Sequence, residues 1–184
     1  MKRLCVFGGS SPGHDPLFVQ HAWRLGELCA EAGWGVIYGG GGRGIMGAVA
    51  DGCVSRGGRV EGVIPHDMVR REWGHKGVHL HIVETMHERK QMMHDLCHAL
   101  VALPGGIGTL DEICEALAWQ KLEIHMKPVA LLNTAGFYDG FLQLLKTTVD
   151  NGFYHPRDQS RLWVVETPEQ LLERLLVHNW ETIS

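Results

Sequence analysis

The sequence lacks a run of about 18 consecutive apolar residues, the length that a membrane-spanning helix needs. It also lacks a basic surplus, because 17 Lys and Arg residues stand against 21 Asp and Glu residues and give a net charge of -4. A nucleic-acid groove would need excess positive charge, so we expect a small-molecule partner and neither a nucleic acid nor a membrane. No repeat, linker or low-complexity segment interrupts the 184 residues, of which 45% are hydrophobic, and we predict a single domain over residues 1–184.

The common metal-ligand patterns H-E-x-x-H and C-x-x-C are also absent. Among the 12 histidines, His87, His94 and His98 have a spacing that puts them on one face of a helix. No acid is placed as a third ligand, so we predict a solvated or packed histidine face and no metal site.

The five cysteines are odd in number, far apart and set among apolar residues, so we expect reduced, buried thiols at Cys5, Cys29, Cys53, Cys97 and Cys114. A strand-like segment, Arg3 to Phe7, follows the first residues directly, so we expect no signal peptide before the fold. Both observations favour a cytoplasmic protein.

Short β-branched runs alternate with helical patterns along the whole chain. This alternation predicts an α/β fold of the Rossmann-like, doubly wound kind, with a mostly parallel sheet of about seven strands flanked by helices. The predicted strands are Arg3–Phe7, Gly35–Tyr38, Val60–Ile64, His79–Val83, Ala99–Leu103, Val129–Leu132 and Leu162–Val165. The predicted helices are Pro16–Ala32, Ile45–Arg56, Met86–Cys97, Leu110–Glu123, Tyr138–Asn151 and Pro168–Asn179.

Three glycine-rich segments follow predicted strands: Gly8–Gly13, Gly39–Gly44 and Pro104–Gly108. Because ligands bind beyond the carboxyl ends of parallel strands, we expect these segments to line one crevice. In the third segment, the glycines leave backbone N–H groups open to an anion, and the following helix adds the positive end of its dipole. That segment therefore predicts a phosphate site.

Two acids, Asp111 and Glu112, come just after this phosphate segment, in the expected first turn of the helix. A carboxylate next to a phosphate suggests chemistry on a phosphorylated sugar. Thr109-x-x-Glu112 also fits a capping box, in which the two side chains satisfy backbone donors at the helix start. Both interpretations stay open from this segment alone.

A further pattern, Gly42-x-Gly44-x-x-Gly47, matches the fingerprint of a dinucleotide-binding turn. The acid at the expected distance is Glu61, which lies inside the strand Val60–Ile64, whereas a ribose-binding acid stands at a strand's end. We therefore disfavour NAD or FAD and predict no cofactor. A tight contact between helix and sheet explains Gly47 at least.

Two motifs, Pro104 to Glu112 (PGGIGTLDE) and Arg89 to Met93 (RKQMM), resemble the Lonely Guy (LOG) family of nucleoside 5′-monophosphate phosphoribohydrolases. Members of this family were long labelled lysine decarboxylases, but the chain shows no lysine signature that would hold pyridoxal phosphate. The resemblance covers nearly the whole chain, with further matches at Val6–Gly13, Tyr38–Gly47, Gly62–Pro65, Lys127–Asn133 and Gly136–Asp139.

The chain departs from the family pattern at Gly8, Gly42, Arg43, His98 and Asp111. Arg43 stands where small or apolar residues are common. From a glycine loop at the crevice, it could bind a second phosphate or clash with a bulky N6 substituent on the base. The choice between AMP and cytokinin nucleotides therefore stays open.

The resemblance implies hydrolysis of the N-glycosidic bond of a purine or cytokinin nucleoside 5′-monophosphate to free base and ribose 5-phosphate. It implies catalytic roles for Glu112, as the carboxylate near C1′, and for Arg89, as a charge-stabilising and orienting group. Asp111 would hold the ribose and Lys90 the phosphate. The other implied substrate-binding residues are Gly9, Ser10, Gly41, Glu72, Met86, Met93, Pro104, Gly105, Gly106, Ile107, Gly108 and Thr109.

The family also forms dimers, which implies a homodimer through the helices Met86–Cys97 and Leu110–Glu123, beside the active site. The rival function is a non-catalytic carrier of a nucleotide or phosphorylated cofactor, because related folds bind such ligands with the same loops. The presence of both Arg89 and Glu112 disfavours the carrier.

Overall fold

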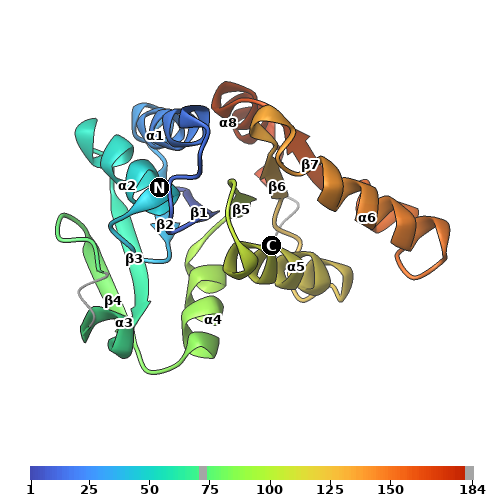
Figure 1. The fold of residues 1–184 in the computed structure, drawn as a ribbon, viewed down its shortest axis with the longest axis horizontal. Helices are drawn as coiled ribbons and strands as arrows, with labels where there is room; N and C mark the ends of the chain where they lie inside the picture. The colour runs from blue at the N-terminus through green and yellow to red at the C-terminus, as the bar shows by residue number, and fades with distance from the viewer. Residues whose placement is uncertain (71–73, 181–184) are drawn as a thin grey trace.

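The computed structural model describes residues 1–70 and 74–180, in which strands and helices alternate along the chain (Figure 1). The strands are β1 (Arg3–Phe7), β2 (Gly35–Tyr38), β3 (Val60–Pro65), β4 (His79–Val83), β5 (Ala99–Ala102), β6 (Val129–Leu132) and β7 (Leu162–Val165). The longer helices are α1 (Pro16–Glu31), α2 (Gly44–Ser55), α4 (Met86–Leu96), α5 (Ile107–Lys121), α6 (Asp139–Asp150) and α8 (Pro168–Val177). Over the described ranges, no helix combines the length and the apolar character that crossing a membrane requires.

All seven strands pair in parallel, in the order β4-β3-β2-β1-β5-β6-β7. The chain first builds outward from β1 to β4, then returns to the other side of β1 and builds outward to β7. This confirms the predicted doubly wound α/β fold, and each predicted strand is present to within one residue. The strand order reverses between β1 and β5, which is where such sheets open a crevice for a ligand.

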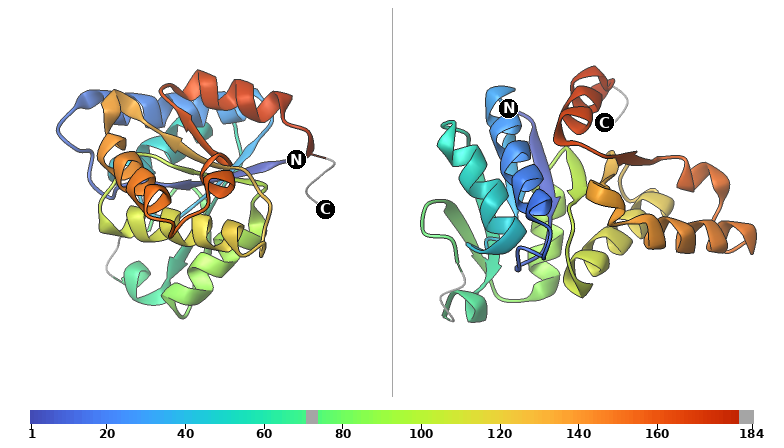
Figure 2. Two further views of the ribbon diagram at one scale, coloured as in Figure 1. Left: turned by 90° about the vertical axis from the view of Figure 1, so that its right-hand side faces the viewer. Right: turned by 45° about the horizontal axis from the view of Figure 1, so that its top comes forward.

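The central strand β1 is buried on both faces of the sheet. Its alternate residues separate two cores: Leu4 and Val6 pack with the cluster that includes residues of α1, α2 and α8, and Cys5 and Phe7 pack with residues of α4 and α5. The two groups of helices lie on opposite sides of the sheet (Figures 1 and 2). Burial on both faces explains why β1 reads as an apolar run and not as an alternating strand.

Three short elements were not expected from the sequence: α3 (His66–Arg70), the 3₁₀ turn η1 (Thr134–Gly136) and α7 (Pro156–Gln159). Each is shorter than two turns of α-helix, too short to show a hydrophobic period. The expectation of five buried cysteines was wrong for Cys114, which is exposed on α5, whereas the other four thiols are buried and free.

Helices α1 and α2 approach each other closely through two glycines. A Cβ on Gly52 would overlap the main-chain carbonyl oxygen of Trp23, and a Cβ on Gly26 would lie 2.6 Å from the main-chain nitrogen of Cys53. Only hydrogen at these two positions permits the observed contact. The contact matters for the crevice because α2 begins at the glycine loop after β2.

We expect Gly52→Ala to destabilise the fold by about 2 kcal/mol, because the added methyl group must push two buried helices apart against only a small gain in helix propensity. Urea unfolding followed by circular dichroism measures this loss. Gly140→Ala is the matched control, since a Cβ at Gly140 in α6 meets no atom within 4 Å. Equal stabilities for the two variants would contradict the close packing of α1 on α2.

Candidate functional site

A cavity of about 580 Å³ opens at the carboxyl ends of the central strands. Its described walls come from the end of β3, from the segments that follow β1, β2, β3 and β5, and from the first two turns of α2, α4 and α5. The lining residues are Gly8, Gly9, Ser10, Gly39, Gly41, Gly42, Arg43, Met46, Ile64, Met68, Met86, Arg89, Gly106, Ile107, Gly108, Thr109 and Glu112. The volume is within the usual range for sites that enclose a small ligand.

One wall of the cavity is the start of α5. The helix begins at Ile107 with Gly106 as its N-cap and without a side-chain cap, so Asp111 and Glu112 are not in its first turn. The first backbone N–H groups of a helix have no partner inside that helix, and here they lie at the cavity wall. The positive end of the helix dipole adds to them, so this wall suits a phosphate group.

The capping-box interpretation of Thr109 and Glu112 was wrong. The sequence predicts a helix start at Leu110, but the helix starts three residues earlier, and Thr109 is already its third residue. The reason is Gly108, which reads as a loop residue and yet is accommodated in the first helical turn, where a Cβ would meet no atom within 4 Å. Glu112 therefore has no capping duty and is free for another role.

The α2 terminus, by contrast, is already occupied. The main-chain N–H groups of Ile45 and Met46 both donate to the Gly9 carbonyl oxygen, at 2.9 and 3.2 Å. The donors that a dinucleotide fingerprint would offer to a pyrophosphate are therefore used within the fold. Glu61 is the second residue of β3, far from its carboxyl end. It forms an ion pair with Arg59 at 2.9 Å and a hydrogen bond with His81 at 2.8 Å.

Arg89 is buried at the base of the cavity and is held from three sides. Its Nε donates to the Val63 carbonyl oxygen at 3.1 Å, and its Nη2 donates to the Gly39 carbonyl oxygen at 3.3 Å. Its Nη1 lies 3.5 Å from Glu112 Oε1. A Cβ on Gly39 would overlap Nη2, so the glycine after β2 is required for this position of the guanidinium.

Glu112 is the carboxylate that faces Arg89, and 11% of its side chain is exposed. Burial raises the pKa of Glu112 to about 7, although the neighbouring Arg89 charge acts in the opposite direction and Asp111 adds to the rise. Near neutral pH, Glu112 can therefore be either a carboxylate or a carboxylic acid. A carboxyl group with this property inside a cavity is suited to proton transfer or to stabilising a developing cation.

Lys90 and Asp111 pair with each other outside the described cavity lining. Lys90 Nζ lies 3.2 Å from Asp111 Oδ2 and 2.9 Å from Glu115 Oε2. The hydrogen bond to Glu115 is the main cause of the raised pKa of Lys90. Asp111 is exposed on α5, one residue before Glu112.

The structure brings most of the remaining expected site residues together. Those that line the cavity are Gly9, Ser10, Gly41, Met86, Gly106, Ile107, Gly108 and Thr109. Pro104 and Gly105 line a smaller neighbouring cavity of about 270 Å³, together with Gly9, Ser10 and Gly106. Met93 is fully buried in the core with Cys5 and Phe7, and Glu72 lies outside the described residues.

Sequence reasoning did not single out several lining residues, above all Met46, Ile64 and Met68. Ile64 could have been found from the end of β3, because that strand also ends at the crevice edge. Met68 stands on α3, which gave no periodic signal. These apolar residues form one wall of the cavity, beside the buried pair of Arg89 and Glu112.

Of the three histidines that share the predicted helix face, His94 and His98 have structural roles and His87 is exposed. His94 is buried against Trp119, with ring centroids 4.5 Å apart, and burial lowers its pKa to about 4. His98 Nδ1 accepts a hydrogen bond from the Arg3 main-chain N–H at 3.2 Å, which gives the family departure at this position a structural role. No group of three or more histidine, cysteine or acidic side chains in the described part of the chain could hold a metal ion.

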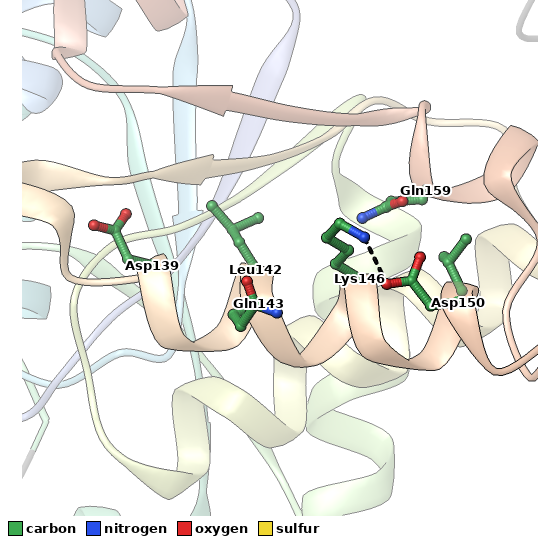
Figure 3. Close-up of a pocket in the computed structure, with 7 residues that line it drawn as sticks. Asp139, Leu142, Gln143, Lys146, Asp150 and Gln159 are labelled. Carbon is green, nitrogen blue, oxygen red and sulfur yellow. Dashed lines mark hydrogen bonds and ion pairs between the residues drawn. The ribbon is translucent and has the colours of Figure 1, made fainter.

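A separate hollow of about 510 Å³ runs along α6 (Figure 3). Its lining shares no residue with the crevice, and its one ion pair joins Lys146 to Asp150 at 2.5 Å. The sticks in Figure 3 show polar and aliphatic side chains along one helix and Gln159 from α7. This arrangement offers no convergent reactive groups, so the crevice is the candidate functional site.

Comparisons with known proteins identify relatives that cover most of the chain. A family model described as "Possible lysine decarboxylase" matches residues 46–175. A probable cytokinin riboside 5′-monophosphate phosphoribohydrolase of rice, LOGL5, is 40% identical over 95% of this chain and 71% of its own length. The corresponding enzyme LOG7 of Arabidopsis thaliana is 43% identical over 91% of this chain and 76% of its own length.

Solved structures share the fold. The molybdenum cofactor binding protein from the phototrophic bacterium Rippkaea orientalis superposes with a TM-score of 0.73. The match covers 95% of each chain at 22% identity. At that identity, the likeness extends to the fold and no further.

The description of the family model as a decarboxylase does not fit this cavity. Enzymes that use pyridoxal phosphate hold it through a lysine Schiff base. No lysine is among the described residues that line the cavity, and Lys90 is engaged by Asp111 and Glu115. The residues present therefore do not suit that cofactor.

The raised pKa of Glu112 predicts a pH-dependent cost to stability. The folded chain binds this proton more tightly than the unfolded chain, whose ordinary value is 4.5, so the free energy of unfolding falls as pH rises from about 4.5 to about 7. Glu112→Gln cannot ionise. We expect this variant to gain about 2 to 3 kcal/mol relative to the parent between pH 5 and pH 8, measured by urea unfolding.

Glu166→Gln is the control for that measurement, because it removes an exposed carboxylate at the end of β7. Its stability should follow that of the parent across the same pH range. Parallel curves for the parent and Glu112→Gln would show that Glu112 ionises normally in the folded chain.

Proposed function

Because the chain belongs to the Lonely Guy (LOG) family, we propose that it hydrolyses the N-glycosidic bond of a purine nucleoside 5′-monophosphate and releases the free base and ribose 5-phosphate. The observation that carries this proposal is the buried pair of Arg89 and Glu112, which faces a cavity bounded by the open N-terminus of α5. A phosphate site and an ionisable carboxylate in one cavity are what cleavage of a phosphorylated sugar requires.

The 5′-phosphate binds at the start of α5 in this proposal. Gly106 and Gly108 leave the backbone N–H groups accessible, and the Thr109 hydroxyl adds a donor. Charge on the phosphate is then stabilised by the helix dipole. The ribose extends from this point toward Glu112, one turn further along the same helix.

The chemical step breaks the bond between C1′ and the base nitrogen. The bonding electrons leave with the base, and positive charge develops on the ribose ring. The Glu112 carboxylate stabilises this charge and takes a proton from the water whose oxygen adds to C1′. The released base takes up a proton from solvent, so atoms and charge balance.

Arg89 acts as a fixed positive charge and not as an acid. Arginine keeps its proton at any pH near neutrality, so it cannot protonate the base. Its two hydrogen bonds to main-chain carbonyl oxygens hold it beside Glu112. In this position it favours the carboxylate form that the reaction needs and orients the phosphate or the leaving base.

The apolar part of the cavity is where we place the base. Met46, Ile64, Met68 and Met86 line it, and flexible methionine side chains adapt to substituents of different size. We propose AMP or N6-substituted AMP, including cytokinin nucleotides, as the substrate class. The names of the rice and Arabidopsis relatives, which are cytokinin riboside 5′-monophosphate phosphoribohydrolases, support the cytokinin nucleotides.

The competing function is that of a carrier for a nucleotide or a phosphorylated cofactor. The fold shared with a molybdenum cofactor binding protein is the observation in its favour. A carrier needs the phosphate site, but it gains nothing from a buried carboxylate whose pKa is about 7. The hydrolase therefore explains more of the site.

We further propose a cytoplasmic protein. The described structure contains no disulfide, and Cys5, Cys29, Cys53 and Cys97 are buried free thiols. Free thiols are typical of reducing compartments. A metal-independent reaction on a nucleotide also fits such a compartment.

Incubation with AMP or N6-isopentenyl-AMP should release the free base, and adenosine should release none, because it lacks the phosphate that the α5 terminus binds. Chromatography for free base measures the products. EDTA should have no effect. Tight binding of both nucleotides without release of base from either would favour the carrier.

Glu112→Gln is the variant that tests the mechanism. It keeps the size of the side chain and removes its charge, so we expect turnover to fall by about 10² to 10³-fold, the usual cost of losing one electrostatic contact to a transition state. Glu115→Gln, which removes a neighbouring carboxylate outside the described lining, is the matched control. Turnover at the parent rate in Glu112→Gln would show that the proposed mechanism is wrong.

A homodimer that forms beside the active site is also proposed. Helices α4 and α5 lie on the same side of the sheet (Figure 1). Exposed apolar side chains mark both ends of α5: Ile107 at its start is 81% exposed, and Leu122 and Ile124 after its end are 66% and 63% exposed. A second copy would bury them.

Light scattering at micromolar concentration should give twice the chain mass of 20.5 kDa. Leu122→Glu should split the dimer and lower the activity, because the interface adjoins the cavity. Val177→Glu on α8, whose side chain is 83% exposed on the opposite face, is the matched control and should leave both unchanged. A monomeric parent, or a split particle with full activity, would contradict the proposal.

A further inference from the structure

The glycine loop from Gly39 to Gly44 carries a single side chain larger than hydrogen, that of Arg43. Arg43 is exposed and is among the residues that line the cavity. The glycine that follows is fixed by its surroundings, since Gly44 has φ of +63° and its missing Cβ would press on the main chain of Ser10. The loop therefore presents one cation on a backbone that has little freedom to move.

Among the described residues, the side chain of Arg43 has no hydrogen-bond or ion-pair partner that would give it a structural role. It is the N-cap residue of α2, but its side chain makes no capping hydrogen bond. The backbone donors of Ile45 and Met46 are taken by the Gly9 carbonyl oxygen. Within residues 1–70 and 74–180, no carboxylate lies within ion-pair distance of Arg43, so none of the described acids neutralises its guanidinium.

The charges around the cavity indicate that a bound phosphate group would need a further cation, which Arg43 can supply. Arg89 is paired with Glu112, and Lys90 is engaged by Asp111 and Glu115. A nucleotide phosphate carries a charge of roughly −1.5 to −2, and a helix N-terminus offers only about +0.5. The α5 terminus alone therefore leaves most of the phosphate charge unbalanced.

We propose that Arg43 is a specificity-determining residue that binds the phosphate group of the ligand together with the N-terminus of α5. Arg43 reaches the phosphate from the wall after β2, and α5 reaches it from the wall after β5. The cavity thereby discriminates a nucleotide from the corresponding nucleoside. The choice of a nucleotide as the ligand rests on the proposed function.

Calorimetric binding of ribose 5-phosphate tests this role without any turnover, with adenosine as the uncharged probe. Arg43→Ala should weaken ribose 5-phosphate binding by about tenfold or more and leave adenosine unchanged, since a charge-assisted contact to phosphate is lost. Arg43→Lys keeps the charge and should recover part of the affinity. Added salt should weaken binding to the parent more than binding to Arg43→Ala.

Arg56→Ala is the matched control, because Arg56 caps the other end of the same helix and pairs with Glu27 at 3.0 Å. It removes the same charge and should bind ribose 5-phosphate as the parent does. Unchanged ribose 5-phosphate affinity in Arg43→Ala, or an equal loss for adenosine, would overturn the proposal. So would faster cleavage of N6-isopentenyl-AMP with unchanged AMP kinetics, which would make Arg43 a steric gate.

These outcomes are separate from those of the hydrolysis assay. Arg43-dependent binding of ribose 5-phosphate with no release of base from AMP would support the role of Arg43 and reject the hydrolase. Release of base with the same ribose 5-phosphate affinity in the parent and Arg43→Ala would do the reverse.

Discussion

The ion pair between Arg89 and Glu112 is the interaction on which the site depends. It joins α4 to α5, and the hydrogen bonds of Arg89 to the Val63 and Gly39 carbonyl oxygens join both helices to β3 and to the loop after β2. One guanidinium thus fixes four segments that are distant in the sequence. Because the pair is buried, ionisation of Glu112 destabilises the folded chain. The fold tolerates this loss of stability at the position where the carboxylate serves the reaction.

Two helices, α2 and α5, begin at this cavity after glycine turns, and they differ in whether their first N–H groups are already hydrogen-bonded within the fold. At α2, the Gly9 carbonyl oxygen accepts from the Ile45 and Met46 N–H groups, so the terminus is sealed by the loop after β1. At α5, Gly106 caps the helix with no side chain and the first donors face the cavity. The glycine pattern alone cannot distinguish the two helix starts. The difference depends on whether a carbonyl oxygen from another loop, here that of Gly9, accepts the first N–H groups of the helix.

The strands of the parallel sheet, and the glycine segments that line the crevice, could be predicted from the sequence. Runs of β-branched residues predict the strands. Because parallel strands have their carboxyl ends at the same edge of the sheet, Gly9, Gly41 and Gly106 were expected at one edge. What failed depended on local geometry. Gly108 concealed the true start of α5, and nothing in a sequence shows that Met93 turns into the core while Met86 turns toward the cavity. The near-neutral pKa of Glu112 also follows from burial, which only the packed structure reveals.

The sheet order has a consequence for how the chain acquires its cavity during folding. Residues 4 to 7 of β1 pair with residues 99 to 102 of β5, so the two central strands must find each other across some ninety-five positions of chain. The part of the chain from β1 to β4 pairs strands that are nearer in sequence, but it supplies only ten of the seventeen described residues that line the cavity. Until β5 closes against β1, the α5 terminus has no opposite wall. The cavity is therefore complete only once β1 and β5 have paired, so ligand binding depends on the contact that joins distant parts of the chain.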